Sequence, residues 1–63
     1  MKIASDERVV WLKVNEELFT HPDITNFFPP EGKTPYWEFH FGDGSWMLAE
    51  GRVMIKVEKK KGR

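Results

Sequence analysis

The sequence predicts an α+β domain, in which a strand and a short helix precede a three-stranded antiparallel meander. Residues 36–58 alternate β-forming and polar side chains, and Asp-Gly at 43–44 and Glu-Gly at 50–51 interrupt them as hairpin loops do. Residues 20–28 combine a helix start signal with apolar residues at helical spacing. We therefore expect the helix to pack on one face of the meander as a two-layer fold.

The loop length sets the register of the predicted meander. If both dipeptides form two-residue loops, one set of apolar side chains shares a single face, which we expect to be buried. This set consists of Trp37, Phe39, Phe41, Trp46, Leu48, Val53, Ile55 and Val57. A three-residue first loop would place Phe41 opposite Ser45 and mix the two faces, so the pattern favours two-residue loops.

Residues 8–14 are the segment with two interpretations. Their three valines favour a first strand. Ser5 and the two acids after it also fit the beginning of a helix over 6–19. The alternatives to the main prediction are therefore a helix at 6–19 packed on the meander, or a small SH3-like barrel.

The short helix is predicted from its ends and its apolar stripe. Thr20 fits an N-cap, and a proline two residues later fits a first helical turn. Ile24, Phe27 and Phe28 follow at positions i, i+3 and i+4. The prolines at 29–30 end the segment, so its apolar stripe is expected to cover the aromatic face of the meander.

Composition places the chain among small single domains. The sequence has 63 residues and no cysteine, so disulfides are excluded and a cytoplasmic protein is expected. No apolar run approaches the ~20 residues of a membrane span. We assign residues 1–58 to the domain and 59–63 to a basic disordered tail.

The charges are unevenly distributed although the formal net charge is zero. Residues 52–63 contain six basic residues and one acidic residue, whereas residues 1–51 contain four basic and nine acidic residues. This asymmetry suggests contact with nucleic acid or another anion through the basic end. The candidate residues are Lys56, Lys59, Lys60, Lys61 and Arg63.

Catalytic and metal chemistry finds little support in the sequence. His21 and His40 are the only histidines and have no neighbouring histidine or cysteine at metal-ligand spacing. Glu38, His40 and Ser45 share the predicted outer face in the order acid, base and nucleophile, but an open sheet offers no oxyanion site. We therefore expect no enzyme, no metal, no cofactor and no small-molecule substrate.

The outer face of the predicted meander is the candidate binding surface, because methionines and a tyrosine stand there in place of charged residues. Its candidate residues are Tyr36, His40, Met47, Ala49 and Met54. The predicted function is a small non-catalytic protein-binding or accessory domain, which binds a partner or forms a homodimer through this face. The alternative is a nucleic-acid-associated regulator that uses the basic C-terminal end.

Overall fold

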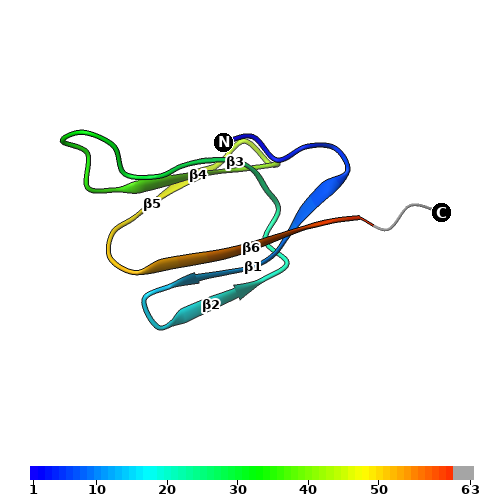
Figure 1. The fold of residues 1–63 in the computed structure, drawn as a ribbon, viewed down its shortest axis with the longest axis horizontal. Helices are drawn as coiled ribbons and strands as arrows, with labels where there is room; N and C mark the ends of the chain where they lie inside the picture. The colour runs from blue at the N-terminus through cyan, green and yellow to red at the C-terminus, as the bar shows by residue number, and fades with distance from the viewer. Residues whose placement is uncertain (61–63) are drawn as a thin grey trace.

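Six strands form two antiparallel sheets in the computed structural model, which describes residues 1–60 (Figure 1). The strands are β1 (Glu7–Val14), β2 (Glu17–Thr20), β3 (Ile24–Phe28), β4 (Trp37–Phe41), β5 (Trp46–Ala49) and β6 (Val53–Lys59). The first sheet has the order β2-β1-β6 and the second the order β3-β4-β5. No helix occurs in residues 1–60, so the α+β prediction is wrong. Of the predicted folds, only the SH3-like barrel lacked a packed helix.

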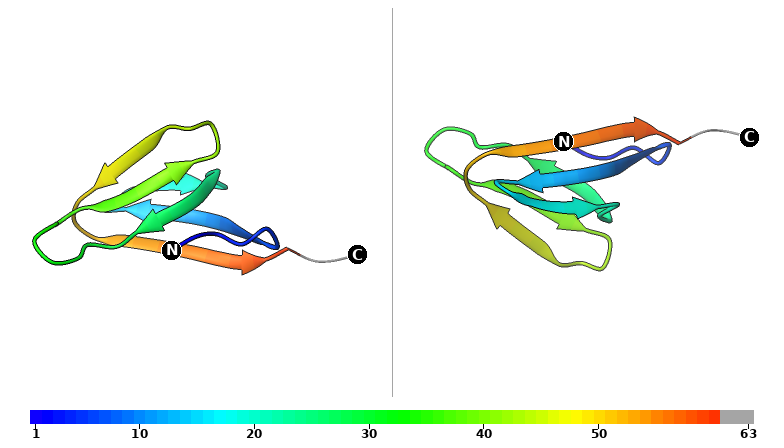
Figure 2. Two further views of the ribbon diagram at one scale, coloured as in Figure 1. Left: turned by 90° about the horizontal axis from the view of Figure 1, so that it is seen from above. Right: turned by 90° about the horizontal axis from the view of Figure 1, so that it is seen from below.

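The two sheets pack face to face and enclose a single core (Figures 1 and 2). Val9 and Leu12 of β1 meet four buried side chains of the second sheet: Ile24, Phe27, Phe39 and Ala49. Leu12 and Phe39 are completely buried. The ring of Phe39 stacks with Trp37 at a centroid distance of 6.0 Å and with Phe27 at 6.3 Å. Stacked aromatic rings thus form part of the core of a chain without disulfides.

The segment predicted as a helix is a bulged strand. The register of β3 against β4 shifts between Ile24 and Asn26, which makes Thr25 an extra residue. Because of this bulge, Ile24 and Phe27 both point into the core although they are three residues apart. Phe28 then faces outward and is 44% exposed. The i, i+3 spacing that predicted a helix therefore comes from a bulge, and the helical prediction is wrong.

A second bulge lies in β1. The prediction of a strand at 8–14 is confirmed, and the alternative helix at 6–19 is excluded. Val9 pairs with Val57 and Trp11 pairs with Lys56, so one residue of β1 is inserted between these pairs. As in β3, two core residues three positions apart share the inner face.

The β4–β5 loop has three residues, 42–44, and not the predicted two. Phe41 N donates to Ser45 O at 2.9 Å, and Gly44 N donates to Phe41 O at 3.1 Å. Gly44 has a φ of 90°, which matches the left-handed last residue of a three-residue hairpin loop with a G1 bulge. The predicted register is therefore wrong by one residue.

This shift exchanges the two faces of β5. Phe39 lies opposite Met47, and Trp37 lies opposite Ala49. Met47 and Ala49 therefore face the core, whereas Trp46 and Leu48, both predicted to be buried, point outward.

The predicted meander ends after β5, because β6 belongs to the other sheet. Residues 50–52 cross between the sheets, and Val53 pairs with Val14 of β1. β6 continues to Lys59, and Lys60 N donates to Asp6 O at 2.7 Å. The first two residues of the predicted tail thus extend this sheet, while residues 61–63 lie outside the described part of the chain.

Candidate functional site

The outer face of the β2-β1-β6 sheet carries lysines between large apolar side chains. Directly opposed residues of neighbouring strands share a face, and two rows cross this one. Thr20, Trp11 and Lys56 form one row, and Leu18, Lys13 and Met54 form the other. In the second row, apolar and cationic side chains therefore alternate across three strands.

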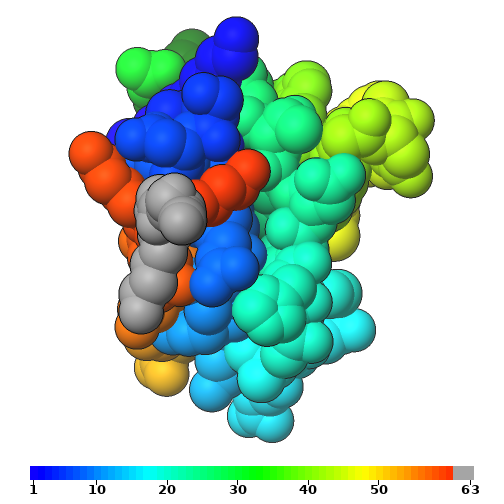
Figure 3. Space-filling view, turned by 90° about the vertical axis from the view of Figure 1, so that its right-hand side faces the viewer, coloured from blue at the N-terminus to red at the C-terminus, as the bar shows by residue number. Residues whose placement is uncertain are grey.

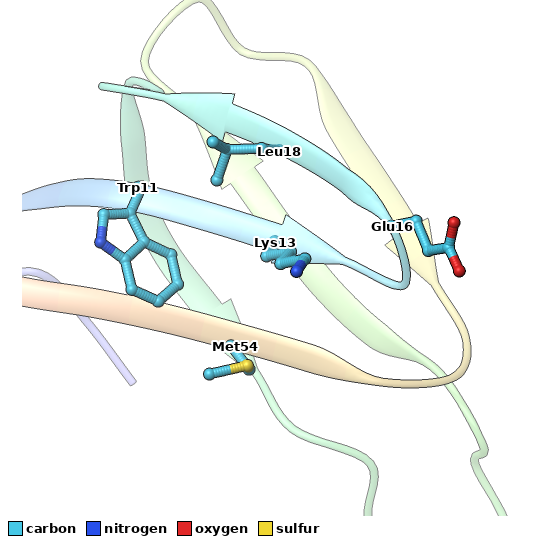
Figure 4. A pocket seen from close by; sticks show the side chains of 5 residues that line it. All are labelled: Trp11, Lys13, Glu16, Leu18 and Met54. Atoms are coloured by element: carbon cyan, nitrogen blue, oxygen red, sulfur yellow. The ribbon is translucent and has the colours of Figure 1, made fainter.

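These rows border a groove of about 460 Å³, lined by Trp11, Lys13, Glu16, Leu18 and Met54 (Figure 4). Trp11 lies at one end of this groove and Glu16 at the other. Leu18 is 56% exposed and Met54 is 58% exposed, so the apolar walls of the groove face solvent. The groove is thus a shallow apolar surface with Lys13 between its walls.

A tight turn positions the acidic end of the groove. Asn15 and Glu16 form a two-residue loop between β1 and β2, with Val14 opposite Glu17. Asn15 adopts a φ of 56°, a conformation that asparagine tolerates better than most residues. Its amide group holds the β5–β6 crossing: Nδ2 donates to Glu50 O at 3.1 Å, and Oδ1 accepts from Arg52 N at 3.0 Å.

The outer face of the second sheet has a different character. His40 Nε2 and Glu38 Oε2 lie 2.5 Å apart, and the ring of Phe28 meets His40 edge-on at 5.6 Å. Trp46 lies opposite His40 and Leu48 opposite Glu38. Apolar side chains therefore surround a carboxylate–imidazole pair on this face.

Ser45 does not join this pair. Its backbone N and its Oγ donate to Asp43 Oδ1 at 2.9 and 2.5 Å. These hydrogen bonds, with the side-chain bond as the larger cause, lower the pKa of the Asp43 carboxyl below its usual value. The Ser45 hydroxyl donates to Asp43 rather than to His40, so acid, base and nucleophile do not form a chain.

The five predicted protein-binding residues lie in separate places. Tyr36 precedes β4 and lines a hollow of about 200 Å³ beside the 29–35 loop. His40 lies on the outer face of the second sheet, whereas Met47 and Ala49 face the core. Only Met54 lies on the groove.

The structure describes some of the predicted anion-binding residues and not others. Lys56 lies on the same face as the groove, in the row of Trp11. Lys59 ends β6, with its Nζ 3.8 Å from an Asp6 carboxylate oxygen. Lys61 and Arg63 lie outside the described residues.

Sequence reasoning missed Trp11 and Leu18 as surface residues. A signal that could have identified Trp11 was the likeness of residues 8–14 to residues 52–57. In this likeness Trp11-Leu12-Lys13 matches Met54-Ile55-Lys56 in pattern. The two segments are neighbouring strands, and each directs its alternating aromatic, methionine and lysine side chains outward. Leu18 had no such signal.

Two further observations bear on the class of site. Within residues 1–60, no group of three or more His, Cys, Asp or Glu side chains is arranged to hold a metal ion. The same part of the chain contains no helix long and apolar enough to cross a bilayer.

No protein-family model, curated protein or solved structure matches this chain.

Proposed function

We propose that the protein is a small non-catalytic protein-binding domain whose binding surface is the groove. The observation that carries this proposal is a concave apolar surface on an open sheet face, with Leu18 and Met54 more than half exposed. Exposed apolar surface of this kind is characteristic of interaction sites. The expected compartment is the cytoplasm, a prediction that rests on the sequence alone.

The charges of the groove indicate the chemistry of the partner. Lys13 lies between the apolar walls and Lys56 lies in the next row, whereas Glu16 stands at the end of the groove. An apolar side chain of the partner would fill the space between Trp11 and Met54. Carboxylates beside it would meet the lysines, so we expect a partner segment that is apolar and acidic.

Site-specific photocrosslinking tests this function. A photoreactive amino acid at Leu18 should yield a discrete crosslinked protein in a lysate of the native host, and the same amino acid at Thr34 should not. Thr34 is also exposed but lies in the 29–35 loop of the other sheet. Met54→Lys should remove the product obtained at Leu18. Equal products from both positions, or a product insensitive to Met54→Lys, would contradict the proposal.

A nucleic-acid role is the second candidate, because Trp11 lies directly opposite Lys56 on a sheet face. An aromatic side chain flanked by cations can stack on an unpaired base and contact its phosphates. The described residues hold eight basic and ten acidic residues, which opposes binding of a polyanion. Under this alternative, oligothymidine should quench tryptophan fluorescence, and Lys56→Gln should reduce the salt slope by roughly 0.7.

A further inference from the structure

Two three-stranded sheets have four edges, and three of these are covered or charged. Residues 1–3 cover the β3 edge: Ile3 N donates to Thr25 O and Phe27 N donates to Met1 O, both at 2.9 Å. The blue N-terminal segment lies beside β3 in Figure 3. The β6 edge carries Lys56, Glu58 and Lys59, and β2 begins with Glu17. Charges and covering segments are the usual means of preventing strand pairing at an edge.

Strand β5 carries no charge of its own, and no segment of residues 1–60 pairs with its free edge. Its sequence is Trp-Met-Leu-Ala, without charge, proline or glycine. It forms one margin of the β3-β4-β5 layer, and only β4 is hydrogen-bonded to it (Figure 2). The strand is therefore open to a further strand on its free side.

The backbone groups that face the free side of β5 follow from its register. Phe41 N donates to Ser45 O, and alternate residues of an antiparallel strand bond to the same neighbour. Ser45, Met47 and Ala49 thus direct their backbone groups to β4. The N–H and C=O groups of Trp46 and Leu48 point away from the sheet, and their side chains are 62% and 47% exposed.

Charge selects among the possible occupants of this edge. A carboxylate precedes the strand at Asp43 and another follows it at Glu50, while Glu38 lies opposite Leu48 on β4. The register that pairs all of β5 with a second copy is antiparallel about Met47. In this register Glu50 would lie level with residue 44 of the copy, beside its Asp43. Such a dimer would place two carboxylates together at each end, which is unfavourable.

We propose that β5 binds an extended segment of another protein, which adds to the sheet as a fourth strand. The segment carries apolar side chains at alternate positions, beside Trp46 and Leu48. Lysine or arginine at its two ends meets Asp43 and Glu50. Main-chain hydrogen bonds then supply affinity and the alternate side chains supply specificity. This site belongs to the sheet opposite the groove and does not depend on the proposed function.

The probe for this proposal is a random dodecapeptide library displayed on phage and selected against the immobilised protein. Selected peptides should alternate apolar residues and carry lysine or arginine at both ends. In an NMR titration with a selected peptide, the amides of Trp46 and Leu48 should gain protection from exchange. A library that yields no enriched sequence overturns the proposal.

Two variants at Leu48 separate strand pairing from side-chain contact. Leu48→Pro removes the leucine side chain and an N–H that faces outward, and proline is tolerated at a sheet edge. Leu48→Thr also removes the leucine side chain but keeps this N–H. Affinity for the peptide should fall about tenfold in Leu48→Pro and less in Leu48→Thr. If Leu48→Pro does not fold, a synthetic chain with N-methyl-leucine at 48 makes the same comparison. Equal affinities for the N–H-deficient chain and the wild type overturn the proposal.

Further variants distinguish the proposed occupant from the alternatives. Glu50→Gln should weaken binding of a lysine-ended peptide and leave its glutamine-ended analogue unaffected. Met54→Lys, in the groove, should leave peptide binding unchanged. Peptides that depend on Met54 and not on Leu48 occupy the groove, which overturns this inference and supports the proposed function. If the protein sediments as a dimer and the amides of Trp46 and Leu48 are protected from exchange in that dimer, a second copy is the occupant. This result also overturns the inference.

Discussion

At the scale of single residues, Gly51 and Asn15 hold the segment that connects the two sheets. Gly51 has a φ of 111°, and a Cβ at this position would overlap the Asn15 side-chain amide that holds residues 50 and 52. A side chain is therefore excluded both by backbone strain and by contact. Glu50-Gly51, which the sequence predicted to be a hairpin loop, lies instead in the connection between the two sheets.

Gly51→Ala should destabilise the fold by about 2–3 kcal/mol, because strain and the displaced Asn15 contact add together. Gly32→Ala is the matched control: its φ is 62°, and a Cβ there meets nothing within 4 Å. It should cost roughly 1 kcal/mol. The measurement is the free energy of unfolding in urea, and equal losses for the two variants would contradict the role given to Asn15.

Asp43 provides a pH-dependent contact of the β4–β5 loop. Its folded pKa is lowered below the ordinary 3.8 by the hydrogen bonds from Ser45. A lowered folded pKa means that the carboxylate favours the folded state above the unfolded pKa. This contribution is lost as pH falls through the folded pKa, below about 3.8.

Ser45→Ala should raise the pKa of Asp43 toward its ordinary value, because the Ser45 hydroxyl is the largest cause of the shift. The backbone N–H of residue 45 still donates, so the return is expected to be partial. The carboxyl carbon shift of Asp43, followed by NMR during acid titration, measures this pKa. Ser5→Ala, in the turn before β1, serves as the control and should leave it unchanged.

At the scale of the elements, local pattern predicted the strands better than their partners. The strand at 8–14 and the hairpin that contains Phe39 were foreseeable, since valines and alternating aromatics are strong β signals. The wrong prediction of a helix at 20–28 could not be avoided from the sequence, because the bulge at Thr25 gives Ile24 and Phe27 a helix-like spacing.

The loop length was likewise hidden from the sequence. Gly42-Asp43-Gly44 suits either a two-residue turn or a three-residue loop that ends in a left-handed glycine. The choice depends on which face of β5 meets the core. Met47 and Ala49 lie opposite Phe39 and Trp37 on the neighbouring strand and pack in the core. Tertiary packing thus overrode a local pattern that favoured Trp46 and Leu48.

The observed register gives a direct stability test. Phe39→Ala should cost on the order of 3–5 kcal/mol, because this completely buried ring packs on Phe27 and Trp37. Trp46→Ala should cost less than about 1 kcal/mol, since its side chain is largely in solvent. Urea denaturation measures both, and loss of dispersed amide signals identifies a chain that no longer folds. Similar costs for the two variants would favour the two-residue loop.

At the scale of the whole molecule, the N-terminal segment connects the sheets along the chain. It pairs with the edge of β3 through residues 1–3 and then enters β1, which is central in the other sheet. Ile3 also packs against the core. This role was not predictable from residues 1–7, because they lack the alternation of a long strand.

A chain that begins at Ala4 should lose about 1–3 kcal/mol of stability, from two backbone hydrogen bonds and the buried part of Ile3. It should also associate at high concentration, because the β3 edge becomes free to pair. Thermal melting measures the first effect and light scattering over a concentration series measures the second. Ile3→Ser, which keeps the backbone bonds, should lose stability without associating. Unchanged exchange protection of the Phe27 amide in the shortened chain would show that residues 1–3 do not cover this edge in solution.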